Sequence, residues 1–249
     1  MMKERLAKFL AHAGVASRRK AEVWIRLGSI SVNGQIVTNV ATLVDPQTDR
    51  IDVEGKRVRT KRQNYVVFNK PKGVMCTLED PHSRNTLTQW LPPKLGRIYP
   101  VGRLDKDSTG LLLLTNDGEL ANRLIHPRYK ISKIYLVDID GLFKADDKKH
   151  LERGIVLEEG RTLPCKVEIL VIGNKISRLR FELREGKKRQ IRRMLEKLGY
   201  NVKSLQRISI GPIELGHLKE GKWRILQPRE ITELKKLTGL GISVTIREK

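Results

Sequence analysis

Four consecutive leucines, Leu111 to Leu114, follow directly on a short polar segment with two aspartates, and this junction constrains the fold more than any other feature. The apolar run predicts a buried strand over residues 111–115. It is far too short to span a membrane. Asp105 and Asp107 are therefore expected at the edge of a core, where a carboxylate needs a cationic or hydrogen-bonding partner.

The same segment invites comparison with a calcium-binding loop. Asp105, Asp107, Thr109 and Gly110 match the first, third, fifth and sixth positions of such a loop. The closing position is Asn116 instead of Glu, and leucines occupy the middle, so we reject a calcium site. A carboxylate that takes part in chemistry is favoured for Asp105, with a turn or capping role as its alternative. For Asp107 the turn or capping role is favoured.

A partner for Asp105 is predicted on a helix over residues 188–198. At 100° per residue, Arg192 lies at the margin of the apolar face, which consists of Ile191, Met194, Leu195 and Leu198. An arginine in that position can bury its stem and present its guanidinium to a carboxylate. We therefore predict that Arg192 pairs with Asp105, the alternative being a surface arginine.

The chain is expected to contain two domains. Residues 1–60 predict two short helices and a small sheet, with Gly14 ending the first helix, Ser17 capping the second and Asn33-Gly34 forming a hairpin turn. Residues 61–64 read as a basic linker, residues 65–240 as a second domain, and residues 241–249 as a tail.

The sequence of the larger domain predicts several strands with helices between them. This pattern indicates an α+β fold with a mixed, largely antiparallel sheet and flanking helices. The expected strands begin at Tyr65 and cover residues 65–68, 98–101, 111–115, 133–139, 163–171, 176–183, 205–210 and 223–226. The expected helices cover residues 118–125, 146–153, 188–198 and 229–237.

Positive charge is the main feature of the composition. Lysine and arginine number 50 against 28 acidic residues, a formal charge of +22. Residues 178–207 contain eleven basic and three acidic residues, and residues 1–64 contain thirteen and six. Such an excess brings a monomer no folding stability and implies a polyanionic partner, first of all nucleic acid. Because both domains are basic, one extended polyanion could touch both.

One basic cluster is more specific. Arg18, Arg19 and Lys20 fall in the first turn of the predicted second helix, where cations oppose the helix dipole. A bound phosphate would relieve this unfavourable placement, so we expect phosphate contact here. The alternative is a solvated basic face.

The composition also excludes several classes of protein. The only cysteines are Cys76 and Cys165, so neither a disulfide framework nor a cysteine-based zinc site is expected, and a reducing compartment fits. No apolar run is long enough to cross a membrane. Lys8 and His12 interrupt the apolar stretch at the N-terminus, which argues against a signal peptide.

Residues 3–60 resemble the small RNA-binding module that is named after a small-subunit ribosomal protein and also occurs in tyrosyl-tRNA synthetases. The resemblance rests on Leu6 to Leu10, on Gly14 to Ala21 and on Gly28 to Gly34. It implies binding to structured RNA, not an enzymatic activity.

Nearly the whole chain resembles the RsuA/RluB-type pseudouridine synthases, which isomerise uridine within RNA. Four motifs in order carry the resemblance: Asn69-Lys70-Pro71-Lys72-Gly73, then residues 102–118, then Lys133-Ile134-Tyr135-Leu136-Val137, and then residues 185–194. The resemblance implies that Asp105 is the catalytic aspartate, that Tyr135 lies in the active site and that Arg192 pairs with Asp105. It implies no cofactor, and no metal ligands are predicted.

Further roles follow from the reaction, which requires the target base to leave the RNA stack. Tyr135 is expected to stack on that base, core packing being its alternative, and Arg103 to fill the gap in the RNA or bind a flanking phosphate. The residues expected to hold RNA are Arg103, Lys70, Lys72, Arg18, Arg19, Lys20, Lys188, Arg189 and Arg193; for Lys70 and Lys72, shaping the active-site wall is the alternative.

The general pattern is nearer to the RluB-like branch, which modifies large-subunit ribosomal RNA, than to the RsuA-like branch. Ribosomal RNA, alone or within an assembly intermediate, is thus the expected partner of a monomeric, cytoplasmic bacterial enzyme that does not bind membranes. Modification of small-subunit RNA is one alternative. The other is a non-catalytic factor that only binds ribosomal RNA.

Overall fold

The computed structural model describes residues 3–59, 62–78 and 85–241. The chain divides into two compact units. The first comprises Met1–Asn64 with Pro93–Ile98 and Asn116–Gly118, and the second comprises the remaining segments from Tyr65 onward. The predicted C-terminal tail lies, from residue 242, outside the described residues, as does Lys61 of the predicted linker.

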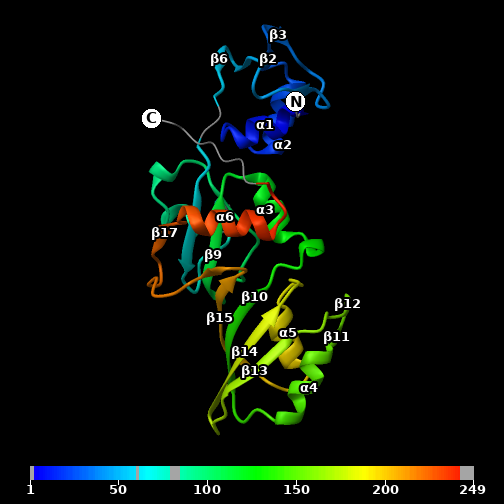
Figure 1. Ribbon diagram of the computed structural model, residues 1–249, viewed down its shortest axis with the longest axis vertical. Coiled ribbons are helices and arrows are strands. Elements are labelled where there is room, and N and C mark those ends of the chain that lie inside the picture. Colours follow the sequence, from blue (N-terminus) through cyan, green and yellow to red (C-terminus); the bar gives the residue numbers. More distant parts are fainter. Residues whose placement is uncertain (1–2, 60–61, 79–84, 242–249) are drawn as a thin grey trace. The chain divides into compact units, whose positions relative to one another are not determined.

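The first unit contains the two expected helices and a small sheet (Figure 1). The Ser17 side chain accepts a hydrogen bond from the Lys20 backbone N–H at 3.2 Å, as expected for the N-cap of the second helix. Asn33 and Gly34 both have positive φ, 53° and 84°, which confirms the predicted hairpin turn. The elements are β1 (Glu4–Arg5), α1 (Leu6–His12), α2 (Arg18–Arg26), β2 (Ile30–Val32), β3 (Gln35–Ile36), β4 (Leu43–Val44), β5 (Ile51–Val53), β6 (Lys56–Arg57) and, in the segment 93–98, η2 (Pro93–Leu95).

Helices and sheet of the first unit share one small core. The buried faces of α1 and α2 meet the strands through Leu6, Leu10, Ile25, Ile30 and Ile51. The strands run in the order β3-β2-β5-β6, all antiparallel, while β1 pairs with β4. In the first turn of α2, Ala21 is buried in this core, whereas Arg18, Arg19 and Lys20 are exposed.

The second unit is built on one mixed sheet with the order β13-β14-β10-β15-β9-β7-β17, to which β8 and β16 add at β9 and β15. All neighbouring pairs are antiparallel except β15 and β9, so the predicted α+β class with a mixed, largely antiparallel sheet is confirmed. The strands are β7 (Tyr65–Lys70), β8 (Tyr99–Pro100), β9 (Thr109–Thr115), β10 (Lys133–Asp140), β13 (Lys166–Val171), β14 (Ile176–Leu183), β15 (Val202–Ile210), β16 (Ile213–Glu214) and β17 (Trp223–Ile225).

The parallel pair depends on a glycine. Gly110 of β9 lies opposite Arg207 of β15 and has φ +99°. A Cβ atom at Gly110 would lie 2.3 Å from the backbone oxygen of Arg207, so no other residue lets the two strands approach this closely.

Helices cover the sheet in two groups. In Figure 1, α3 and α6 lie beside the half that holds β9 and β17, and α4 and α5 lie beside the half that holds β13 and β14. The helical elements are α3 (Gly118–Ile125), α4 (Ala145–Arg153), α5 (Gln190–Glu196), α6 (Pro228–Leu237), η1 (Leu87–Gln89) and η3 (Pro127–Tyr129); a hairpin of β11 (Val156–Leu157) and β12 (Gly160–Arg161) accompanies α4.

Each half has its own core. Leu111 and Leu113 of β9 pack with Leu120 and Leu124 of α3 in one, and Phe181 of β14 packs with the apolar face of α5 in the other. All four leucines of β9 are buried, as their sequence predicts. Among the described residues, no helix combines the length and apolarity that crossing a membrane requires.

Candidate active site

A cavity of about 740 Å³ opens in the second unit where its two cores meet. Its apolar wall includes Leu124 and Ile210 from one core and Leu183 and Ile191 from the other. Its polar lining comes from the loop before β9, from β10, from β15 and from the segment between β14 and α5. The polar side chains of this lining include Arg103, Asp105, Lys133, Tyr135, Glu185, Arg189 and Arg207.

Asp105 stands in a tight turn that several backbone groups hold. Its carbonyl oxygen accepts a hydrogen bond from the Ser108 N–H at 3.1 Å. The Gly73 N–H donates to the carbonyl of Lys106 at 2.7 Å, and the Leu104 N–H donates to Sγ of Cys76 at 3.3 Å. The segment after β7 thus fixes the backbone on both sides of Asp105, and the carboxylate lies at the wall of the cavity.

The predicted ion pair between Arg192 and Asp105 is not found, because Arg192 bonds to the neighbouring Asp107. Its Nη2 lies 3.3 Å from Oδ2 of Asp107 and donates to the Asp107 carbonyl at 3.2 Å. Its Nη1 donates to the Val202 carbonyl. The turn at residues 106–107 directs Asp107 toward α5. The predicted position of Arg192 at the margin of the apolar helix face is therefore correct, but Asp105 as its predicted partner is wrong.

Asp107 carries a second arginine as well. Arg189 donates from Nη1 and Nη2 to the two carboxylate oxygens of Asp107, at 3.0 and 3.1 Å. Burial raises the pKa of Asp107, but the hydrogen bonds from Arg189 and the charge of Arg192 lower it more, and the pKa ends below its usual range. The charge of Asp105 also acts on Arg189 and Arg192, so both cations lie within electrostatic reach of the cavity wall.

Lys70 corrects another expectation. Its side chain is fully buried, and Nζ donates to the carbonyls of Pro71 and Val74, both at 2.9 Å. Burial lowers the pKa of Lys70, while the negative charges of Asp107 and Asp105 oppose that shift. A lysine enclosed in this way holds the loop after β7 and cannot contact RNA, so only its role in shaping the wall is compatible with the structure.

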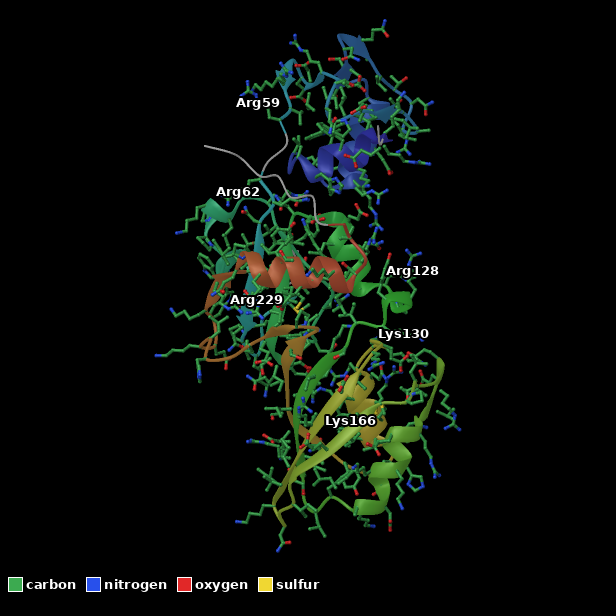
Figure 2. All side chains as sticks on the ribbon, viewed as in Figure 1. Arg59, Arg62, Arg128, Lys130, Lys166 and Arg229 are labelled. Atoms are coloured by element: carbon green, nitrogen blue, oxygen red, sulfur yellow. The ribbon has the colours of Figure 1, made fainter. Side chains whose placement is uncertain are left out.

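Tyr135 and Arg103 both reach the cavity, as the predicted roles require. Tyr135 is half-buried on β10, directly opposite Arg207 of β15. Arg103 is exposed two residues before Asp105, at the cavity mouth. Figure 2 shows Arg128 and Lys130 on the segment between α3 and β10. Pro127 and Ile131 of this segment line the cavity.

Comparisons with known proteins identify the family of each unit. The family model described as RNA pseudouridylate synthase matches residues 64–197, and the S4 domain model matches residues 4–51. The chain belongs to the RNA pseudouridylate synthase family. The predicted resemblances of the second and first units are both confirmed by these matches.

The pseudouridine synthase is similar over its whole length to curated relatives. It is 44% identical to an uncharacterised RNA pseudouridine synthase of Aquifex aeolicus (strain VF5), over 96% of this chain and 97% of the relative. It is 43% identical to the ribosomal large subunit pseudouridine synthase B of Bacillus subtilis (strain 168), over 96% and 98%. A crystal structure of a pseudouridylate synthase matches with a TM-score of 0.68 and 33% identity, over 92% of this chain and 99% of that one.

The remaining basic residues of the pseudouridine synthase fall into two groups. Lys72 and Lys188 are exposed, as are the first-turn cations of α2, and all stay predicted RNA contacts. Arg193 instead bonds to both carboxylate oxygens of Glu159, at 2.8 and 2.9 Å, and Arg189 is held by Asp107. Arg189 lines the cavity, whereas Arg193 does not.

Two cations that line the cavity of the synthase, Lys133 and Arg207, were given no role from the sequence, and for Asp107 only a turn or capping role was favoured. A signal existed for Arg207, because alternation along β15 puts it on the same face as Leu205 and Ser209, which are buried. For Lys133 the signal was its spacing of two from Tyr135 on one strand. Among the described residues, no group of His, Cys, Asp or Glu side chains has the arrangement of a metal site.

Proposed function

We propose that this chain converts a uridine of large-subunit ribosomal RNA to pseudouridine, with Asp105 as the catalytic carboxylate. The target is supported by full-length similarity to a Bacillus subtilis relative named for the large ribosomal subunit. A Pseudomonas aeruginosa relative with the same name is 37% identical over 99% of this chain. The S4 domain supports RNA as the partner.

The observation that carries the proposal is the cavity itself, which places a carboxylate, a tyrosine ring and a mouth arginine around one space. Asp105 lies at its wall, Tyr135 on the strand behind it, and Arg103 at its mouth. A nucleotide turned out of the RNA stack would enter this space, stack on Tyr135 and bring its sugar to Asp105. Arg103 would bind a flanking phosphate or take the vacated position in the RNA.

The chemistry suits a carboxylate. The bond between C1′ of ribose and N1 of uracil breaks and the electron pair stays on the base. The base turns, a bond forms between C5 and C1′, and the hydrogen of C5 is released. Asp105 either attacks the sugar as a nucleophile or balances its positive charge, as carboxylates do in glycoside cleavage. This sequence of steps consumes no cofactor.

The cations near Asp105 leave its carboxylate accessible. Arg189 and Arg192 are fastened to Asp107 by their guanidinium groups, so they do not collapse onto Asp105. Their charges, and that of Lys70, still interact with Asp105 at longer range. A catalytic side chain that is attracted but not covered by cations remains free to contact the substrate.

The test is tritium release from ribosomal RNA labelled at C5 of uridine, with purified large- and small-subunit RNA supplied separately. Wild type and Asp140→Asn are expected to release tritium from large-subunit RNA, and Asp105→Asn to bind the RNA without release. Asp140 is a matched control because it lies on β10 outside the cavity, bonded to Asn201 and Lys203. Each RNA is also supplied within partly assembled ribosomal particles.

Three outcomes would contradict the proposal. Tritium release from small-subunit RNA alone would show that small-subunit RNA, not large-subunit RNA, is the substrate. Binding by wild type without release from any RNA or particle would support a non-catalytic factor. Full release by Asp105→Asn would remove the catalytic assignment. The proposed substrate places the enzyme in the bacterial cytoplasm, and we propose that it acts there as a monomer.

A further inference from the structure

Two cations in the cavity lining, Lys133 and Arg207, form no ion pair with any of the described carboxylates. Arg207 of β15 pairs across the sheet with Tyr135 of β10, and Lys133 lies two residues before Tyr135 on the same strand. The β10–β15 ladder shifts register between Ile134 and Tyr135, so a bulge turns this part of β15. All three side chains line the cavity.

Arg207 is built into the wall. It is 3% exposed, and its Nε donates to the Leu111 carbonyl of β9 at 2.8 Å, which fixes the guanidinium. Its Nη2 is buried and has no hydrogen-bond partner. A guanidinium nitrogen left without a partner costs free energy in the protein alone, because water is removed and nothing replaces it. A guanidinium that is fixed at the cavity wall and only partly paired is suited to meet an acceptor of a bound ligand.

Lys133 points to the same conclusion independently. Its Nζ donates to the Ile131 carbonyl at 3.2 Å, which leaves further N–H donors. Burial and the charge of Arg207 lower the pKa of Lys133 to about 8. In the described part of the chain, no carboxylate oxygen lies within 4.0 Å of either cation. Two like charges at this depth destabilise the unliganded enzyme.

The position of the two cations within the cavity indicates which part of the nucleotide they bind. Acceptor oxygens of the target nucleotide could come from its phosphate or from the carbonyls of its base. The depth of Arg207, which is 3% exposed in the cavity lining, favours the base, because the base is the part of a flipped nucleotide that leaves the RNA strand and enters the protein. Uracil also carries negative charge when the C1′–N1 bond has broken, and that charge is delocalised onto its two carbonyl oxygens.

We propose that Arg207 and Lys133 bind a carbonyl edge of the flipped uracil and stabilise the negative charge it carries while it is detached from the sugar. This inference rests on the proposed function. Positive groups fixed in advance where charge develops stabilise the transition state more than the bound substrate. The electron pair of the broken C1′–N1 bond stays on the base, and the contact with the two cations stabilises it there. The negative charge disappears when C5 bonds to C1′ and the C5 hydrogen leaves as a proton.

The test compares four variants by tritium release from labelled large-subunit ribosomal RNA, with kcat and KM measured separately. Lys133→Met is expected to lower kcat about 100-fold with KM changed less than about 3-fold. Lys133→Arg keeps a cation and is expected to recover kcat to within about 10-fold of wild type. Lys166→Met and Arg229→Lys are matched controls at exposed positions outside the cavity (Figure 2).

Arg207→Lys is measured as a fifth variant, and its thermal unfolding is measured as well. We expect its kcat to be about 10- to 100-fold lower than that of wild type. If it does not fold, the two Lys133 variants decide the question. A raised KM with unchanged kcat would indicate a phosphate contact and overturn the inference, and so would equal loss in Lys133→Met and Lys133→Arg. No release by wild type would overturn the proposed function as well, whereas wild-type rates in Lys133→Met would overturn the inference alone.

Discussion

Arg192 of α5 is joined to Asp107, not to Asp105, with Nη2 3.3 Å from Oδ2 and a second bond to the Asp107 carbonyl. This ion pair fastens a helix of one core to the turn that carries the candidate catalytic carboxylate. The two aspartates therefore have different roles. Asp107 holds the arginines, and Asp105 is left at the cavity wall.

Asp107→Asn tests this division. The side chain of Arg192 is only 12% exposed, so removing its carboxylate partner leaves a charge that is partly buried and poorly compensated. We expect a loss of about 2 kcal/mol in the free energy of unfolding, together with a reduced kcat. Asp105→Asn is expected to keep wild-type stability and lose activity. Chemical unfolding and tritium release measure both, and equal stability of Asp107→Asn and wild type would contradict the fastening role.

Gly110→Ala tests how far the site depends on the parallel strand pair. The new methyl group would meet the Arg207 backbone at 2.3 Å, and alanine strongly resists φ +99°. We expect the free energy of unfolding to fall by about 3 kcal/mol and activity to fall with it, because β9 and β15 must separate. Gly186→Ala is the stability control, since its Cβ enters open space. A stable Gly110→Ala would show that the strands adjust without cost.

Periodicity predicted the elements of the larger domain well. The bounds of α3 and β14 agree with the predicted ranges 118–125 and 176–183, since both segments have regular apolar spacing and clear turn residues. Predicted α5 was longer, over 188–198, than the observed Gln190–Glu196. Arg189 has φ 49°, a left-handed conformation that begins the helix late and that no spacing rule predicts.

Site chemistry was harder to predict than the elements. Asp105 lies in the cavity lining and Arg192 is mostly buried on α5, as expected, but which of two nearby aspartates meets the arginine depends on the direction of one turn. Lys70 was assigned to RNA because lysine is rarely buried, yet two carbonyls enclose its ammonium. Sequence patterns show which residue types are present, while partner choice depends on angles and depths that only the folded chain has.

The pH dependence of the reaction is expected to reflect Lys133. With a pKa of about 8, Lys133 is protonated below that pH and loses its charge above it. If its charge stabilises the detached base, kcat/KM falls as pH rises through about 8 in wild type but not in Lys133→Arg, which stays charged. The other ionisable groups of the cavity lie before β9 (Arg103, Asp105), after α3 (His126), on β10 (Tyr135), on β15 (Arg207) and in the segment 184–189. A fall at the same pH in both proteins would assign it to one of these groups.

Phosphate contact by the first turn of α2 is tested by its salt dependence. Arg18, Arg19 and Lys20 are exposed at a helix N-terminus, where phosphate oxygens would relieve the opposition between cations and dipole. In the full chain, replacing all three by Gln is expected to weaken ribosomal RNA binding. It should also reduce the slope of log Kd against log salt by about 2, because fewer counterions are released. The control replaces Lys144, Lys148 and Lys149, at and within the start of α4, by Gln. If both triple variants show the same slope, the loss reflects net charge, and the helix turn is a solvated basic face.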